Sequence, residues 1–142
     1  MIRVVLDTNI VVSALLQPLG PPAQVVVLAL NGSMQLCVSG NVYAEYEEVV
    51  RRGKFQRAVD TVAAMLGAIR DRAFWVKVTE TVQACSDADD NIFLECAQAS
   101  QADYLVTGNL KHFPTSRAGT RVVTARWLLD ILSNGTDKAS PE

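Results

Sequence analysis

The sequence lacks an excess of basic residues. Lys and Arg together number 13 and Asp and Glu number 15, so the formal net charge is −2. Nucleic-acid-binding proteins usually carry a basic surface, so this composition excludes binding of a nucleic acid by overall charge attraction alone. Two interpretations remain: the partner is not a nucleic acid, or an acidic site has its charge reversed locally by bound cations.

Long apolar runs and cysteine motifs are also missing. No stretch approaches the roughly 18–20 consecutive apolar residues of a membrane span, and the apolar run at the N-terminus contains Asp7, which argues against a signal peptide. The cysteines, Cys37, Cys85 and Cys96, are odd in number and match no zinc motif. We therefore expect a cytoplasmic protein with no membrane segment.

What the sequence does have is 49% apolar residues over 142 positions, which is enough for one domain with a substantial core. Short β-branched runs alternate with helical patterns, and this alternation predicts a three-layer α/β/α fold with a central parallel sheet of about five strands. We expect strands at 2–7, 34–39, 73–78, 103–109 and 120–124, and helices at 9–17, 21–31, 41–52, 56–71, 86–100 and 125–133. The predicted domain covers 1–132, and the polar stretch 133–142 is expected to be a flexible tail.

The run VVLDTNIVVSALL (4–16) places one charged residue, Asp7, between two stretches that both favour burial. Such a charge is costly unless something pairs with it. In parallel α/β folds, ligands gather beyond the carboxyl ends of the strands, so the residues that follow each strand are the candidates for a site. Polar side chains follow four predicted strands: Asp7 after the first, Glu45 one helical turn beyond the second, Asp87, Asp89 and Asp90 after the third, and Thr107 and Asn109 after the fourth.

Helical geometry narrows the choice among the acidic residues. At 100° per residue, Glu45 lies about 40° from Val49, at the border of the apolar stripe of its helix, whereas Glu47 lies on the solvent side. Asp90 faces inward on the later helix. Asp89 lies on the same side, so this geometry does not separate the two aspartates.

Carboxylates that lie close together repel one another and favour protonation unless a cation is present. Oxygen ligands without nitrogen or sulfur favour a hard ion such as Mg²⁺ or Mn²⁺. Sites with one or two such ions catalyse in-line displacement at phosphorus, and a metal-bound water serves as nucleophile without a general-base histidine. The acidic strand ends therefore predict a metal-dependent site for phosphodiester hydrolysis.

Each acidic residue also has a structural interpretation. Asp7 can cap the helix that follows it, Glu45 can be an ordinary solvated helix residue, and Asn109 can be a plain turn residue. At least one of the three aspartates in 87–90 is expected to cap a helix start. The coincidence of all these residues at neighbouring strand ends favours a shared site.

The segment VVRRGKFQR (49–57) brings Arg51, Arg52 and Lys54 together with an aromatic residue among them. This patch can follow a nucleic-acid backbone, with a solvated helix end as the alternative. Lys111 is a candidate for contact with a phosphate. The single histidine, His112, is expected to be structural or on the surface.

Three segments resemble the PIN domain family: VVLDTNIVVSALL (4–16), LCVSGNVYAEYEEVVRRGKF (36–55) and CSDADDNIFLECAQASQADYLVTGNLKHFP (85–114). The resemblance extends over about 2–132. It is closest to bacterial PIN proteins described as toxins of type II toxin–antitoxin pairs, relatives of the VapC-type toxins. The combination of LDTN after a terminal strand with ADYLVTGN later in the chain is the most specific part.

The resemblance implies a ribonuclease that depends on one or two Mg²⁺ or Mn²⁺ ions, that is inhibited by an antitoxin protein and that is often a homodimer. The acidic residues of the family correspond to Asp7, Glu45 and Asp90. The fourth position is commonly aspartate but is Asn109 here, and this change removes one negative charge and should weaken a second metal site.

Further positions of this sequence match supporting residues of the family. Asn9 and Thr107 correspond to residues that support the site by hydrogen bonding. Asp87 and Asp89 resemble a D-x-D-D feature of one subtype, and Asp89 can assist Asp90 as a metal ligand or take its place.

Other classes fit the residues less well. A haloacid-dehalogenase phosphatase needs an aspartate where Asn9 stands, a receiver domain needs an acidic pair after the first strand, and a dinucleotide-binding domain needs a glycine-rich first turn. The serious alternative is a PIN-like module that binds an antitoxin or RNA without cutting. Asn109 and the negative net charge favour that alternative.

Overall fold

Strand β1 (Arg3–Leu6) lies at the centre of the sheet. The computed structural model describes residues 1–52 and 58–134. Val4, Val5 and Leu6 have no exposed surface, as expected for a continuously apolar strand covered on both faces. β1 pairs in parallel with β2 (Gln35–Val38) on one side and β4 (Tyr104–Val106) on the other.

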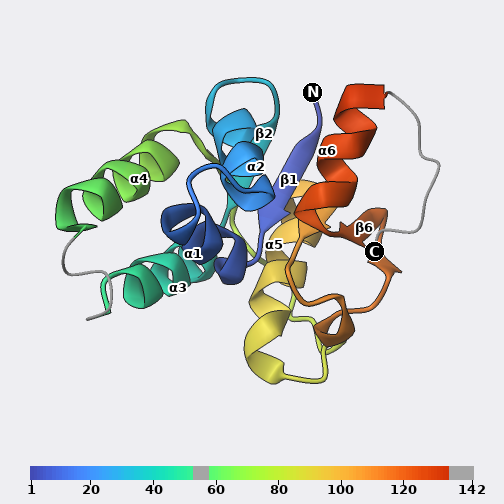
Figure 1. Ribbon diagram of the computed structural model, residues 1–142. Helices are drawn as coiled ribbons and strands as arrows, with labels where there is room; N and C mark the ends of the chain where they lie inside the picture. Colours follow the sequence, from blue (N-terminus) through green and yellow to red (C-terminus); the bar gives the residue numbers. More distant parts are fainter. Residues whose placement is uncertain (53–57, 135–142) are drawn as a thin grey trace.

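The described residues form a six-stranded sheet in the order β3-β2-β1-β4-β6-β5 (Figure 1). β3 (Phe74–Trp75) and β6 (Thr120–Val123) extend the parallel part of the sheet. β5 (Ser116–Arg117) pairs antiparallel with β6 through a tight turn in which Ala118 and Gly119 have φ values of 51° and 88°. The sheet is therefore mixed and mostly parallel, with one antiparallel edge strand that the sequence analysis did not predict.

In the described part of the chain, six α-helices flank this sheet. Their bounds are α1 (Thr8–Leu16), α2 (Pro21–Leu30), α3 (Gly40–Val50), α4 (Val59–Arg72), α5 (Asn91–Ser100) and α6 (Ala125–Asn134). α5 contacts β1, β2 and β4, whereas α2 contacts α1, α6 and β2, and Figure 1 shows α2 in front of the sheet. This arrangement confirms the predicted α/β class with helices around a central sheet.

Local sequence explains where several helices begin. The Ser39 side chain caps α3, because Oγ accepts a hydrogen bond of 3.2 Å from the backbone N–H of Val42. Pro21 and Pro22 stand at the first positions of α2, where a missing N–H costs nothing. The observed first residues, Pro21 and Gly40, lie within one residue of the starts of the helices predicted at 21–31 and 41–52.

Several predicted elements differ in extent from the observed ones. The strand predicted at 103–109 is only Tyr104–Val106, and positions 56–57 of the helix predicted at 56–71 lie outside the described residues. The strand predicted at 73–78 pairs over only two residues, since it lies at the sheet edge with Phe74 and Trp75 both more than 40% exposed. The helix predicted from 86 begins at Asn91, because a 3₁₀ turn, η2 (Ala88–Asp90), precedes it. Asp87, Asp89 and Asp90 therefore lie in or next to this turn and not directly at the end of β3.

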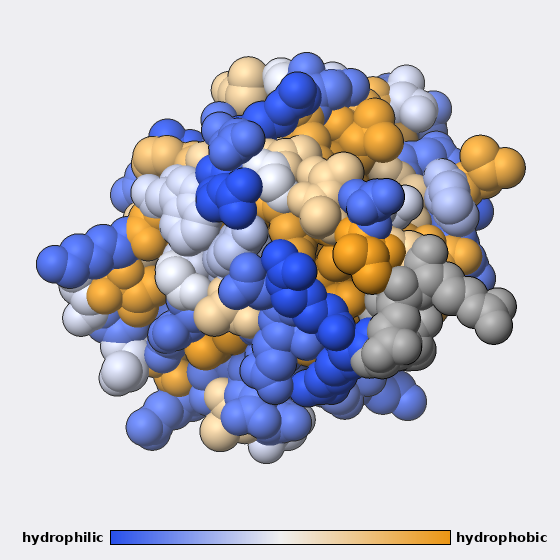
Figure 2. All heavy atoms as spheres, turned by 90° about the vertical axis from the view of Figure 1, so that its left-hand side faces the viewer, coloured by the Kyte–Doolittle hydropathy of each residue, from blue (hydrophilic) through white to orange (hydrophobic). Residues whose placement is uncertain are grey.

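The predicted domain end at 132 falls inside α6, which continues to Asn134; the rest of the predicted tail lies outside the described residues. No single helix in the described part of the chain is long and apolar enough to cross a membrane. Only α1 and α2 taken together have the length and composition for it, and they are bent by 110° at their junction. On the side of α4, hydrophobic atoms gather in separate patches between hydrophilic ones (Figure 2).

Candidate active site

Asp7 follows β1 directly and is 7% exposed. Its carboxylate Oδ2 accepts a hydrogen bond of 2.8 Å from Thr107 Oγ1, and its backbone N–H donates to the carbonyl of Val106 at 2.9 Å. Asp7 occupies the N-cap position of α1, yet its side chain makes no capping hydrogen bond. The carboxylate is thus directed to the end of β4 and not to its own helix.

The pKa of Asp7 is raised above its ordinary value of 3.8. Burial is the largest cause, because removal from water disfavours the charged form, and the negative charge of Asp90 acts in the same direction. The hydrogen bond from Thr107 opposes both effects. Asp7 and Asp90 are therefore close enough to interact electrostatically.

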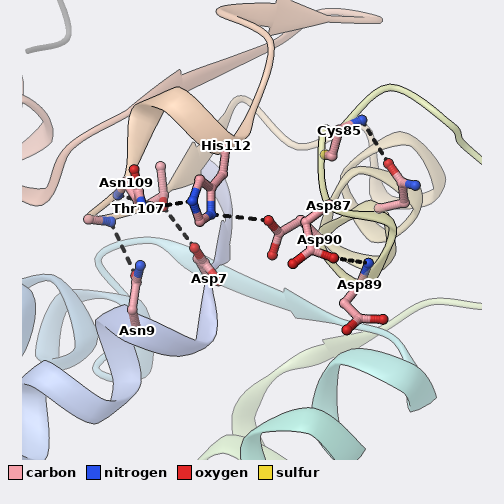
Figure 3. A network of polar contacts seen from close by, with 11 residues as sticks. Asp7, Asn9, Cys85, Asp87, Asp89, Asp90, Thr107, Asn109 and His112 are labelled. Atoms are coloured by element: carbon pink, nitrogen blue, oxygen red, sulfur yellow. Dashed lines mark hydrogen bonds and ion pairs between the residues drawn. The ribbon is translucent and has the colours of Figure 1, made fainter.

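Thr107 also organises the turn after β4 (Figure 3). Its Oγ1 accepts a hydrogen bond of 3.0 Å from the backbone N–H of Asn109. The backbone N–H of Gly108 donates to Asn9 Oδ1 at 3.1 Å. Asn9 and Thr107 thus join the start of α1 to the end of β4, on either side of Asp7.

Asp90 ends η2 and has an 18% exposed side chain. Its Oδ2 is buried and makes no hydrogen bond of ordinary geometry; His112 Nδ1 lies 3.3 Å away. Burial is the first cause that raises the pKa of Asp90, and the charge of Asp87 adds to it, whereas His112 lowers it. Apart from the contact with His112 Nδ1, Asp90 Oδ2 therefore has no hydrogen-bond donor among the described residues.

Glu45 lies on α3 and is partly buried. The neighbouring Tyr46 is fully buried, and its hydroxyl donates to the carbonyl of Leu6 at 2.5 Å, which fixes this turn of α3 beside the end of β1. Burial is the largest cause that raises the pKa of Glu45; the charges of Glu48, Asp89 and Asp90 also raise it. The partial burial of Glu45 agrees with its predicted place at the border of the apolar stripe, and its part in the site stays a prediction.

The three aspartates of 87–90 have different surroundings. Asp87 caps η2, because its Oδ1 accepts a hydrogen bond of 2.9 Å from the backbone N–H of Asp89. Asp89 is exposed, whereas Asp90 is partly buried against His112. Burial therefore favours Asp90 over Asp89 as the inward-facing carboxylate, a choice that helical geometry alone left open.

Two residues near the site were missed by sequence reasoning. His112 contacts both Asp90 and Asn109; its position three residues after Asn109, in the turn η3 (Leu110–His112), was the available signal. Asn91 is 9% exposed, and its Oδ1 accepts hydrogen bonds from the backbone N–H groups of Ala84 and Cys85 at 3.2 and 2.9 Å. No spacing in the sequence points to this role of Asn91.

Comparison with known proteins gives the family. The PIN domain family model matches residues 3–111 of this chain. The chain belongs to the PIN domain family.

One protein sequence and one solved structure are similar to this PIN domain. An uncharacterized protein from Methanocaldococcus jannaschii is 26% identical over 111 residues, which cover 76% of this chain and 71% of the relative. A crystal structure of VapBC2 from Rickettsia felis, bound to a DNA fragment from the promoter, contains a chain with 17% identity and a TM-score of 0.57. That match covers 87% of this PIN domain and 98% of the other chain, and it supports the fold.

The acidic residues of this PIN domain can be tested for their fit to a hard cation. Within residues 1–52 and 58–134, no three His, Cys, Asp or Glu side chains are already arranged as a metal site. Mg²⁺ does not require such a cage, because it keeps several waters and binds through one or two carboxylates. A buried carboxylate oxygen without a regular hydrogen bond on Asp90, close to the buried carboxylate of Asp7, fits that mode of binding.

The basic candidates lie on exposed surface. Arg51 and Arg52 follow α3 and pair with Glu47 at 3.8 Å and Glu48 at 3.2 Å. Exposed pairs of this kind are weak, about 0–1 kcal/mol, so both arginines can exchange partners. Lys111 is exposed in η3, and Lys54 lies outside the described residues.

Proposed function

We propose that this PIN domain is a metal-dependent endoribonuclease and the toxin of a toxin–antitoxin pair. The observation that carries the nuclease proposal is the convergence of Asp7 and Asp90, two partly or fully buried carboxylates from segments far apart in the sequence. A pair of buried acids is costly for a fold unless a cation offsets the charge. Membership of the PIN domain family supports the same conclusion.

In this proposal Asp7, Glu45 and Asp90 hold Mg²⁺ or Mn²⁺, with Asn109 and Asp89 as further oxygen donors. The ion supplies Lewis acidity and lowers the pKa of water next to a phosphodiester. Thr107 orients Asp7 by donating to Oδ2, and this hydrogen bond opposes the rise in the pKa of Asp7. Asn9 fixes the backbone of Gly108, and Asp87 fixes the turn that carries Asp90. Asn109 carries no charge, so it would hold a second ion less strongly than an aspartate would.

RNA is the proposed substrate class because the sequence resembles ribonucleases of this family. Arg51, Arg52 and Lys111 are exposed cations available to contact phosphates, and Lys54 belongs to the same proposed set. These proposed basic contacts are few, so a cation held by the acidic residues would supply much of the attraction for the scissile phosphate.

The partner proposed is a cognate antitoxin protein, supported by the likeness of the fold to a VapBC2 chain. Leu16 at the end of α1, Leu19 between the two helices and Val27 on α2 are 58%, 92% and 58% exposed. Covering such apolar surface with a partner protein is favourable, because it removes the surface from water. We also propose that the protein forms a homodimer and is located in the cytoplasm.

The test combines metal binding with cleavage. Mn²⁺ and Mg²⁺ should raise the melting temperature of the wild type and support cleavage of RNA, and Asp7→Asn and Asp90→Asn should lose both effects. Asp71→Asn, which removes an exposed carboxylate on α4, is the matched control and should behave as the wild type. Metal binding with intact RNA, in protein free of antitoxin, would instead favour a binding module.

A further inference from the structure

An open hollow of about 450 Å³ lies between the loop 81–86 and the first turns of α5. Its volume falls within the range of about 300–1,000 Å³ that is typical of ligand sites. Val82, which is 3% exposed, and the partly buried Ile92 belong to its apolar lining, whereas Thr81 and Ser86 contribute exposed hydroxyl groups. The hollow therefore has the size and the mixed lining of a ligand site.

The hollow adjoins the proposed metal site. Cys85 and Ala88 line it, and Ala88 begins the turn η2 that carries Asp90. Burial raises the pKa of the Cys85 thiol to about 11, and the charges of Asp90 and Asp7 add to this rise. Such an effect requires the thiol to lie close to both carboxylates. A ligand in the hollow would therefore lie next to a phosphodiester held at the metal site.

Two side chains of α5 that line the hollow have hydrogen-bonding atoms without a partner in the described part of the chain. Glu95 Oε2 accepts a hydrogen bond of 3.0 Å from the backbone N–H of Val82, which leaves Oε1 without a donor. Asn91 Oδ1 accepts from the backbone N–H groups of Ala84 and Cys85, so its Nδ2 is the atom that remains for a ligand (Figure 3). The hollow thus offers one acceptor and one donor whose orientations are fixed by the loop.

The charge of the lining favours a base over a phosphate. No Lys or Arg is among the described residues that line the hollow, and the carboxylate of Glu95 repels a phosphate. Guanine presents two adjacent donors, N1–H and N2–H, on its Watson–Crick edge, with the acceptor O6 beside them. A carboxylate can accept from both donors, and an amide NH₂ can donate to O6. Adenine, cytosine and uracil each have an acceptor next to their donor, and that acceptor faces the carboxylate unfavourably.

We propose that this hollow binds a guanine base of the RNA next to the scissile bond, and that Glu95 determines the preference for guanine. This inference rests on the proposed ribonuclease function and deepens it by naming the base. Glu95 accepts from N1–H and N2–H, and Asn91 donates to O6. Two explanations compete with it: Glu95 only holds the loop through Val82, or the hollow takes a free guanine nucleotide.

Binding in the absence of metal tests the base preference separately from catalysis. The ligands are five-nucleotide RNAs that are uridine except at the central position, which is guanosine, inosine or adenosine. Their dissociation constants are measured by fluorescence anisotropy in EDTA at one salt concentration. Inosine lacks only the N2 amino group, so it removes one of the two hydrogen bonds to Glu95. We expect the adenosine RNA to bind about tenfold more weakly than the guanosine RNA, with the inosine RNA between them.

Glu95→Gln separates recognition of the base from support of the loop. Glutamine keeps an oxygen that accepts from Val82 and directs its NH₂ group to the hollow, where this group meets the donors of guanine. We expect the three RNAs to bind Glu95→Gln within about threefold of one another. Glu80→Gln is the matched control, because it removes a carboxylate beside the same loop that does not line the hollow, and it should keep the preference.

A second variant carries the test if Glu95→Gln does not fold. Thr81→Trp fills the hollow from an exposed position and should likewise abolish the preference for guanosine. Melting temperatures without RNA show whether each variant is folded.

Cleavage links the hollow to the proposed nuclease. With Mn²⁺, the wild type should cut a mixed-sequence RNA next to guanosines, and Glu95→Gln should cut it without that preference. On an RNA that contains no guanosine, the rates of the two proteins should agree within about threefold, since the hollow then contributes equally little to both.

The outcomes distinguish this inference from the function on which it rests. Equal binding of the guanosine and adenosine RNAs, or an unchanged preference in Glu95→Gln, would overturn the guanine site and leave the proposed nuclease intact. Guanosine monophosphate that binds as tightly as the guanosine RNA, with cleavage that ignores guanosine, would assign the hollow to a free nucleotide and overturn its role in RNA recognition. Guanosine-dependent binding without any cleavage would overturn the nuclease, and with it the place of the hollow beside a scissile bond.

Discussion

Thr107 Oγ1 donates a hydrogen bond of 2.8 Å to Asp7 Oδ2, although the two residues lie 100 positions apart in the sequence. The same hydroxyl oxygen accepts from the backbone N–H of Asn109. One side chain therefore orients the carboxylate at the end of β1 and shapes the turn at the end of β4.

Thr107→Val should remove both hydrogen bonds while keeping the shape of the side chain. Thr107 is fully buried, so we expect a loss of about 1–3 kcal/mol in the free energy of unfolding, measured with urea. The pKa of Asp7 should rise further because the hydrogen bond lowers it. Thr107→Ser retains the hydroxyl and is the matched control. Equal free energies of unfolding for Thr107→Val and Thr107→Ser would show that the two hydrogen bonds do not stabilise the fold.

Asp7→Asn should raise the melting temperature of the metal-free protein at neutral pH. Burial raises the pKa of Asp7 in the folded state, so the folded protein binds this proton more tightly than the unfolded chain does. Ionisation of Asp7 therefore costs stability as the pH rises through the folded pKa, and the cost disappears as the pH falls toward 3.8, the ordinary value.

The difference in melting temperature between Asp7→Asn and wild type should accordingly shrink on acidification. It should reverse when Mn²⁺ is added at neutral pH, because only the wild type gains from the cation. Asp71→Asn, on exposed surface, is the control for the loss of one negative charge. A wild type that is more stable than Asp7→Asn without metal at neutral pH would contradict the stated cost of burying Asp7.

The sequence predicted the parts of this fold that depend on repetition along the chain. The continuous apolar run predicted β1 and therefore the position of Asp7 at the carboxyl end of that strand. The helical periodicity predicted that Glu45 lies at the border of the buried face of α3, and Glu45 is partly buried. The predictions failed where a single contact decides the structure. The cap made by Asp87 turns the chain into η2 and delays α5 to Asn91, and no periodic pattern reports such a contact.

The long-range polar contacts were beyond sequence reasoning for the same reason. His112 reaches Asp90 from a different turn, and their proximity depends on the assembled sheet. The choice between Asp89 and Asp90 likewise required burial, because both lie on one side of the predicted helix.

Glu45→Gln should lower metal-dependent RNA cleavage by about 100-fold, while Glu47→Gln on the same helix should stay within about threefold of the wild type. Loss of a ligand that helps a cation stabilise charge in the transition state costs several kcal/mol, and each 1.36 kcal/mol corresponds to tenfold in rate. Glu47 pairs instead with Arg51, at 3.8 Å, and both side chains are exposed. Initial rates on a labelled RNA at saturating Mn²⁺ measure the difference.

Equal rates for the two glutamine variants would remove Glu45 from the proposed site. Equal losses would point instead to a general effect of negative charge on α3. The melting temperatures of both variants should match that of the wild type within a few degrees, since each residue retains solvent exposure.

Asn91→Ala should destabilise the protein by about 1–3 kcal/mol, because it leaves two backbone N–H groups without their acceptor in a partly buried loop. Asn91 follows Asp90 directly, so loosening of the loop at Ala84 and Cys85 should also weaken Mn²⁺ binding. Gln83→Ala truncates an exposed side chain of the same loop and should leave both quantities unchanged. Urea unfolding and Mn²⁺ titration measure the two effects. A destabilised Asn91→Ala variant with unaltered Mn²⁺ affinity would show that this loop supports the fold without helping to position Asp90.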